Sequence, residues 1–186
     1  MYPVIFAHGL ESSPKGTKAS YLRERFGAVS PELGKLSLEG QVDALEDELV
    51  SRDKNVLVGS SLGGLAAIGA AHKAADSIAH LVLLAPAVSA WRHRDVFKDA
   101  ERIRPGLREK ALELSRLSIP ESTPCTIIHG FEDDVVYCED VVGLAARSPS
   151  ARLILVHDDH PLRRSASLIL SVVDQVANSR DPIVVS

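Results

Sequence analysis

The feature that most constrains the fold is a regular alternation of short, wholly apolar runs with longer amphipathic stretches. Each run is continuously hydrophobic, as is typical of strands in a parallel sheet that are buried on both faces. A weaker candidate, Ala28–Ser30, is closed by Pro31. Because parallel strands need helical crossovers, the chain is predicted to form an α/β fold with a doubly wound, mostly parallel sheet of five or six strands. The clear runs are Pro3–Ala7, Asn55–Gly59, Leu81–Ala85, Cys125–His129 and Leu153–Val156.

Helical patterns occupy two of the intervals between these runs and the stretch after the last of them. From Glu39 to Arg52 the apolar side chains form one stripe, with acidic residues facing away. Leu62–Ala75 is rich in small residues, which allow close packing against a sheet. Pro161–Asn178 repeats its apolar residues in steps of three and four, and Pro161 suits the first turn of a helix. These patterns predict helices that cover the faces of the sheet.

Residues 86–123 interrupt the alternation with a connection far longer than usual. We expect it to form one or two helices that lean over the functional site, within a single domain spanning residues 1–186 and lacking a large cap. The interspersed carboxylates favour a solvated helix face over an anion-binding patch. Its aromatic and basic side chains include Trp91, Arg92, His93, Arg94, Arg102, Arg104 and Arg108.

Composition and charge argue against several classes of function. The formal net charge of −4 gives no electrostatic reason to expect nucleic acid as a partner. No stretch approaches the roughly 20 apolar residues that cross a membrane, and the N-terminus lacks the layout of a signal peptide, so we expect a cytoplasmic protein. Cys125 and Cys138 are too few for a disulfide framework and lack metal-ligand spacing. We therefore expect two reduced thiols, no metal and no cofactor.

The segment Gly59-Ser60-Ser61-Leu62-Gly63 follows a predicted strand and opens a predicted helix. A nucleophile on such a sharp turn has a strained backbone and close neighbours on both sides. Glycines two residues before and two after it remove the Cβ atoms that would clash. The helix dipole behind the turn favours negative charge there. The alternatives are a phosphate-binding loop or a plain tight turn, but the lysine of a P-loop and the spacing of a dinucleotide site are missing. Ser61 is the predicted nucleophile.

A serine hydroxyl needs a base to take its proton, and histidine is the usual one. Catalytic groups gather at the carboxyl ends of parallel strands. His72 falls inside a predicted helix, His80 at the start of a strand and His93 in the long connection. His157 and His160 both follow the last strand. His160 stands at the far end of that loop, from which its ring can reach the nucleophile, so we predict it as the base, with His157 as the alternative.

The base in turn needs a carboxylate to orient it and to stabilise its charged form. Asp133 lies in the loop after the strand Cys125–His129, with the apolar pair Val135-Val136 behind it as an anchor. Asp134 is the alternative, with a helix-capping or surface role as its simpler interpretation. We predict Asp133 as the acid, which gives the chain order Ser61, Asp133, His160.

A tetrahedral intermediate needs two backbone N–H donors, each contributing about 3 kcal/mol. The residue after the nucleophile, Leu62, supplies one of them. The other is expected from the loop after the first strand, where Gly9 allows an unusual turn and Leu10 follows it. We predict the Leu10 N–H as the second donor and interpret His8 as a structural residue of the loop.

These segments together resemble the α/β-hydrolase superfamily and, more narrowly, the small bacterial esterases called YqiA-like. The resemblance rests on segments that run from about residue 2 to residue 175. The order nucleophile, acid, histidine in the superfamily sets aside His8 and His129, which end earlier strands. The resemblance implies ester hydrolysis on short acyl substrates without a cofactor. The matching segments are His8-Gly9-Leu10-Glu11-Ser12-Ser13-Pro14, Lys18-Ala19-Ser20, Val58-Gly59-Ser60-Ser61-Leu62-Gly63-Gly64, Pro86-Ala87-Val88 and Asp133-Asp134-Val135.

Three functions fit the predicted residues. The first is hydrolysis of small carboxylic esters through an acyl-enzyme on Ser61. The second is thioester hydrolysis with the same residues, in which Arg163 and the arginines of the long connection attract a phosphate-bearing acyl carrier. The third is a catalytically weak binding or scaffold protein, because a fold alone never proves activity. A small-molecule ester is the expected partner, and the oligomeric state stays open.

Overall fold

The computed structural model describes residues 1–88 and 105–179, in which five strands form one sheet. Their order is β1-β2-β3-β4-β5, and every neighbouring pair is parallel. β1, β2 and β4 are buried at every residue, as their continuous hydrophobicity predicted. The strands are β1 (Val4–Ala7), β2 (Asn55–Ser60), β3 (Ile78–Leu84), β4 (Cys125–Gly130) and β5 (Ala151–Val156).

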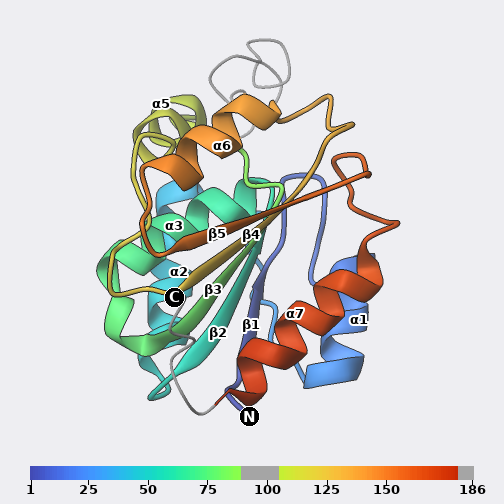
Figure 1. Cartoon of the computed structure of the whole chain (residues 1–186). Helices are drawn as coiled ribbons and strands as arrows, with labels where there is room; N and C mark the ends of the chain where they lie inside the picture. The colour runs from blue at the N-terminus through green and yellow to red at the C-terminus, as the bar shows by residue number, and fades with distance from the viewer. Residues whose placement is uncertain (89–104, 180–186) are drawn as a thin grey trace.

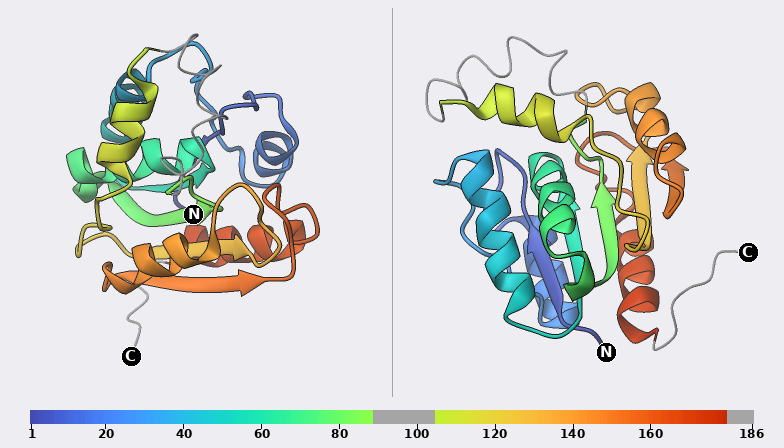
Figure 2. Two further views of the ribbon diagram at one scale, coloured as in Figure 1. Left: turned by 90° about the horizontal axis from the view of Figure 1, so that it is seen from above. Right: turned by 90° about the vertical axis from the view of Figure 1, so that its left-hand side faces the viewer.

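Helices cover both faces of the sheet (Figures 1 and 2). One buried cluster joins α2, α3, α5 and α6 to one face, and a second joins α1 and α7 to the other. The helices are α1 (Thr17–Phe26), α2 (Leu38–Val50), α3 (Leu62–Lys73), α5 (Leu107–Leu114), α6 (Cys138–Ala146) and α7 (Ala166–Asn178), with a 3₁₀ turn η1 (Ala75–Ser77). The predicted doubly wound α/β fold is therefore confirmed.

The sheet has five strands because the weak candidate Ala28–Ser30 does not extend it. Val29 makes only an isolated parallel bridge with Ile5. The Phe6 N–H donates to the Val29 carbonyl at 2.8 Å, and the Val29 N–H donates to Val4 at 3.0 Å. Pro31, which has no N–H, prevents the pairing from continuing.

The last helix begins later than predicted, at Ala166 instead of Pro161. Leu162 has a positive φ of 53°, so the backbone there cannot be helical. Its side chain is nevertheless buried. The prediction was wrong because the apolar periodicity of Leu162 reflects burial in a turn. Residues 157–165 form a loop that projects beyond the end of β5.

Of the long connection 86–123, the described part contains helix α5, which packs on α2 and α3 through Leu107, Ala111 and Leu114. Residues 89–104, which include Trp91, Arg92, His93, Arg94, Arg102 and Arg104, lie outside the described residues. None of the described helices is both long and apolar enough to cross a membrane.

Because all five strands run in the same direction, their carboxyl ends meet at one edge of the sheet. The loops after β1, β2, β4 and β5 leave from this edge (Figure 1). They carry Leu10, Ser61, Asp133 and His160, respectively. The fold therefore brings segments from the whole chain to one place.

Candidate active site

Ser61 occupies the sharp turn between β2 and α3, with φ 54° and ψ −120°. Three hydrogen bonds hold this strained backbone: its N–H donates to Leu84, and its carbonyl accepts from Gly64 and Ala87, all at 2.9–3.0 Å. A Cβ on Gly59 would lie 2.8 Å from the Cβ of Ala67. The turn is therefore tightly packed on the strand side of the serine, and no larger residue fits at Gly59.

His160 links the serine hydroxyl to the carboxylate of Asp133. Its Nε2 lies 2.9 Å from Ser61 Oγ, and its Nδ1 lies 2.8 Å from Asp133 Oδ2. The carboxylate accepts the Nδ1–H, which leaves Nε2 as the acceptor of the Ser61 hydroxyl proton. The His160 side chain is 18% exposed, so a small molecule can reach the pair from solvent.

The side chain of Asp133 is fully buried, and hydrogen bonds compensate its charge. Its Oδ1 accepts the N–H groups of Val135 and Val136 at 2.9 and 2.7 Å. Burial alone would raise the pKa of Asp133, but the bonds from His160, Val136 and Val135 hold it below the usual value. The carboxylate therefore stays ionised and faces the imidazole.

The loop after β1 lies against the nucleophile. A Cβ on Gly9 would be 3.1 Å from Ser61 Cβ and 3.3 Å from the Ser60 carbonyl oxygen. Among the described residues, no acceptor takes the backbone N–H of Leu10 or of Leu62. Leu62 is the first residue of α3, where backbone N–H groups have no partner within the helix. Both amides are free to bind an incoming oxygen.

The other polar candidates lie apart from this chain of hydrogen bonds. Asp134 is exposed, and His157 is exposed with its ring 5.7 Å from that of Phe131. His8 is buried, accepts the Leu33 N–H at 3.4 Å and donates from Nδ1 to the Gly9 carbonyl. These contacts give His8 the structural place that the sequence suggested.

One buried residue beside the acid was set aside as a base in the sequence analysis, and its contact with Asp133 was not predicted. His129, in β4, is completely buried, and its Nδ1 lies 3.7 Å from Asp133 Oδ2, beyond hydrogen-bonding distance. Neither ring nitrogen is hydrogen-bonded to any of the described residues. Burial lowers the pKa of His129, and the nearby carboxylate only partly offsets this. The imidazole of His129 therefore lies near the same oxygen of Asp133 that accepts the His160 Nδ1–H.

Sequence reasoning also missed Asp158, whose side chain is buried in the loop that carries His160. Its Oδ2 accepts both the N–H and the hydroxyl of Ser165 at 2.8 Å, and its Oδ1 accepts the Asp159 N–H at 2.9 Å. The Glu132 N–H donates to the Asp158 carbonyl at 3.0 Å. Asp158 thus joins the histidine loop to the loop of the acid. Its position in a run of two aspartates gave no signal of burial.

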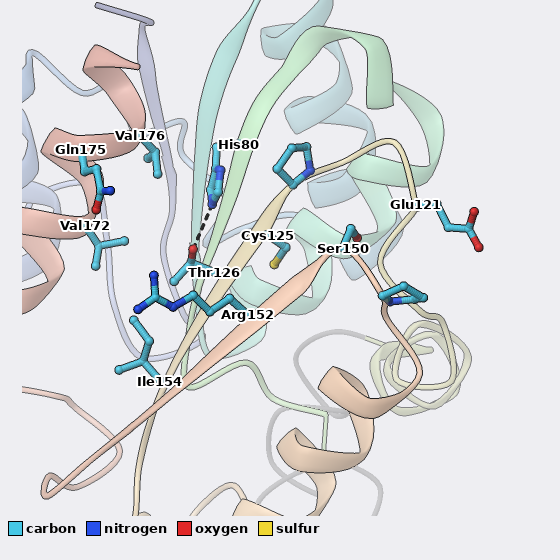
Figure 3. A pocket seen from close by; sticks show the side chains of 12 residues that line it. His80, Glu121, Cys125, Thr126, Ser150, Arg152, Ile154, Val172, Gln175 and Val176 are labelled. Carbon is cyan, nitrogen blue, oxygen red and sulfur yellow. Dashed lines mark hydrogen bonds between the residues drawn. The ribbon is translucent and has the colours of Figure 1, made fainter. Parts of the chain in front are cut away.

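A cavity of about 270 Å³ lies at the opposite end of the sheet, between α7 and the amino ends of β4 and β5 (Figure 3). His80 lines it, with Nε2 3.0 Å from Thr126 Oγ1, and burial lowers the pKa of His80 to about 4. No residue predicted to act chemically lines this cavity. Within residues 1–88 and 105–179, no three His, Cys, Asp or Glu side chains are grouped as metal ligands.

Comparison with known proteins places the chain among α/β hydrolases by fold. Residues 3–164 match the model of an uncharacterised protein family, UPF0227. No curated protein matches the sequence closely enough to count as a relative. The family match covers most of the chain, and the structures below confirm the predicted α/β-hydrolase fold.

Three solved structures illustrate the likeness in fold. Alpha/beta hydrolase domain-containing protein 10 from mouse is 22% identical with a TM-score of 0.77, over 94% of this chain and 88% of that one. Est1E from Butyrivibrio proteoclasticus is 19% identical with a TM-score of 0.74, over 94% and 86%, and it has also been solved with ferulic acid bound. MGS-MChE2, an alpha/beta hydrolase enzyme from a lagoon-sediment metagenome of Mar Chica, Morocco, is 21% identical with a TM-score of 0.64, over 94% and 91%.

Proposed function

The chain belongs to the uncharacterised protein family UPF0227, and we propose that it hydrolyses carboxylic esters of small acyl groups with Ser61 as the nucleophile. The observation that carries the proposal is the unbroken chain of hydrogen bonds from Ser61 Oγ through His160 to Asp133, at 2.9 and 2.8 Å. A serine, a neutral imidazole and an ionised carboxylate in this order are what nucleophilic acyl transfer requires.

The first half of the reaction forms an acyl-enzyme. His160 Nε2 takes the hydroxyl proton of Ser61 while Oγ attacks the ester carbonyl, and the N–H groups of Leu10 and Leu62 stabilise the oxyanion. The buried carboxylate of Asp133 stabilises the imidazolium that forms. His160 then passes the proton to the leaving alcohol, and the ester C–O bond breaks.

The second half repeats the sequence with water as the nucleophile. His160 takes a proton from the water as its oxygen attacks the acyl carbonyl, and the same two amides hold the second oxyanion. Collapse of this intermediate breaks the bond to Ser61 Oγ, which regains the proton from His160. The products are a carboxylic acid and an alcohol, and the protein residues return to their starting state.

A fluorophosphonate probe tests the proposal directly, because it reacts with an activated serine without requiring the right substrate. We expect the wild-type protein to be labelled and Ser61→Ala to be unlabelled. Ser60→Ala is the matched control, since Ser60 is the neighbouring serine and the last residue of β2. An unlabelled wild type would contradict the proposal and favour a binding or scaffold role.

Turnover measurements then separate the substrate classes. We expect hydrolysis of p-nitrophenyl acetate to exceed that of acetyl-CoA. Methyl ferulate provides a larger aromatic acyl group, chosen because Est1E, which shares the fold, binds ferulic acid. A higher kcat/KM on acetyl-CoA than on both esters would replace ester hydrolysis by thioester hydrolysis with the same residues.

A further inference from the structure

The position of His160 is decided by a loop without regular secondary structure, residues 157–165. For proton transfer its ring must stay within hydrogen-bonding distance of both Ser61 and Asp133. An error of about 1 Å in such an arrangement can cost about 100-fold in rate. The loop therefore needs contacts that fix it against the rest of the fold.

Asp158 fixes the base of this loop by hydrogen bonds, and at its tip the buried side chain of Leu162 packs in the core cluster that it shares with α1 and α7. By accepting two bonds from Ser165, it ties the start of the loop to the residue that precedes α7. The tip, residues 160–162, lies between these two anchor points. Within it, the Leu162 N–H donates back to the Asp159 carbonyl at 3.0 Å. This hydrogen bond closes a turn but does not join the backbone of the tip to another element.

Lys18, on helix α1, reaches the tip from across the sheet edge. Its Nζ donates to the carbonyl of Pro161, the residue after His160, at 2.6 Å. Among the described residues, this is the only hydrogen bond from another element to the backbone of residues 160–162. The contact spans 143 positions in the sequence. It connects the helix that follows the Leu10 loop with the loop of the base.

The ammonium of Lys18 is held there at a cost in solvation. Burial lowers the pKa of Lys18, the neighbouring Arg163 lowers it further, and Asp158 and Asp159 only partly compensate. A lysine in open solvent has no such cost. A charge-assisted bond to a carbonyl is roughly twice as strong as a neutral one, which suits an anchor for a short turn. An apolar side chain of similar length would leave the Pro161 carbonyl without this donor.

We infer that Lys18 is a positioning residue for His160: by holding the Pro161 carbonyl, it sets the place of the imidazole between Ser61 and Asp133. This inference rests on the proposed function, because it assigns Lys18 a role in placing the base. Lys18 does not touch the reacting atoms. Its contribution should therefore appear in kcat and in the geometry of the His160 ring, and much less in substrate binding.

The central comparison is between Lys18→Met, which keeps the length but removes the donor, and Lys73→Met. Lys73 pairs with Asp43 and Glu46 on α2, so it controls for loss of a lysine with partners elsewhere. We expect Lys18→Met to lower kcat on p-nitrophenyl acetate by about 10-fold to 100-fold with KM within about twofold. Lys73→Met should match the wild type in both. A Lys18→Met variant with wild-type kcat, whatever its melting temperature, would overturn the inference.

Restoring the ammonium provides the converse test. In a Cys138→Ser background, Lys18→Cys can be alkylated with bromoethylamine, which rebuilds a side chain of lysine length that ends in an ammonium group. Alkylation with 1-iodopropane gives an adduct of the same length that ends in a methyl group, without the charge and without a hydrogen-bond donor. We expect the first treatment to recover most of kcat and the second to recover little. Equal recovery with both reagents would show that packing alone is needed, and would overturn the inference.

A spectroscopic measurement keeps this inference separable from the proposed function. The proton between His160 Nδ1 and Asp133 Oδ2 should give a low-field proton resonance that disappears in Asp133→Asn. We expect this resonance to shift or broaden in Lys18→Met and to stay unchanged in Lys73→Met. A wild type that neither turns over esters nor reacts with the probe contradicts the proposed function. In that case the resonance still tests whether Lys18 positions His160. An unchanged resonance in Lys18→Met overturns that role.

Discussion

A Cβ atom on Gly63 would lie 2.3 Å from the carbonyl oxygen of Ala7 and 2.5 Å from that of His8. The first turn of α3 and the end of β1 are therefore in direct backbone contact. This contact brings the loop after β1 beside Ser61, where a Cβ on Gly9 would lie 3.1 Å from the Cβ of Ser61. Gly63, the second glycine of the Gly59–Gly63 turn, is therefore needed for the close packing of β1 as well as for the turn itself.

Gly63→Ala should lower the free energy of unfolding by about 3 kcal/mol, because the new methyl group overlaps backbone atoms that cannot move away. Gly143→Ala is the control. That glycine lies inside α6, and its nearest atom to a new Cβ is 3.8 Å away, on Arg147. It should raise stability by about 0.5–1 kcal/mol, since alanine favours a helix. Urea unfolding measures the free energy of unfolding of both variants, and equal effects would show that Gly63 is not crowded by the backbone of β1.

Asp133→Asn should lower kcat by about 10⁴-fold, because an amide cannot hold the imidazole in the required tautomer or stabilise its charge. Asp134→Asn should have little effect, since Asp134 is exposed and outside the hydrogen-bonded chain. Steady-state kinetics on p-nitrophenyl acetate compare the two. If Asp134→Asn caused the larger loss, the assignment of the acid would pass to Asp134.

Asp158→Asn should destabilise the protein at neutral pH by about 2 kcal/mol through weaker bonds to Ser165. Although burial would raise it, hydrogen bonds from Ser165 and Asp159 hold the pKa of Asp158 below the usual value. Its stabilising effect is therefore present above the unfolded pKa and is lost as pH falls through the lower folded pKa. Unfolding curves should show that the difference in free energy of unfolding between Asp158→Asn and the wild type shrinks at acid pH. Asp174→Asn is the control, because Asp174 forms an exposed ion pair with Arg25, and its stability should stay near that of the wild type.

His80→Leu should make stability less sensitive to pH between about 6.5 and 4. Burial lowers the pKa of His80 to about 4 from 6.5, so the unfolded chain takes up a proton in this range that the folded protein does not. Wild-type stability therefore falls as pH decreases, by up to the order of 3 kcal/mol from this residue. Thermal unfolding at several pH values gives the slope. An identical slope in His80→Leu would show that the ring becomes charged within the fold.

The sequence predicted the fold well because the strands are marked by continuous apolar runs, and β1, β2 and β4 are buried at every residue. It placed the start of α7 five residues early, because Leu162 continues the helical spacing while its backbone has a positive φ. Leu162 is buried in the core cluster formed by α1, α7 and the sheet. An apolar residue buried in a turn and one buried in a helix look the same in local periodicity.

The candidate site was predictable to the extent that its residues end strands. Ser61, Asp133 and His160 each follow a different strand, so sheet geometry alone points to one edge, and the structure brings these three side chains together. Lys18 was not predicted because its partner, Pro161, lies 143 positions away in the chain. Asp158 and His129 were not predicted because their complete burial depends on how the fold packs around them. A lysine on an amphipathic helix and an aspartate in a polar loop resemble solvated residues until the fold is known.

The separation of Ser61 and His160 by 99 positions has a consequence for how the protein matures. Because nucleophile, acid and base follow β2, β4 and β5, no nascent or truncated chain that lacks the last strand can hydrolyse an ester by this route. Recovery of activity after dilution from denaturant would therefore time the docking of β5 at the edge of the sheet. If activity recovers more slowly than the far-ultraviolet circular dichroism signal, β5 joins the sheet after the other strands have formed.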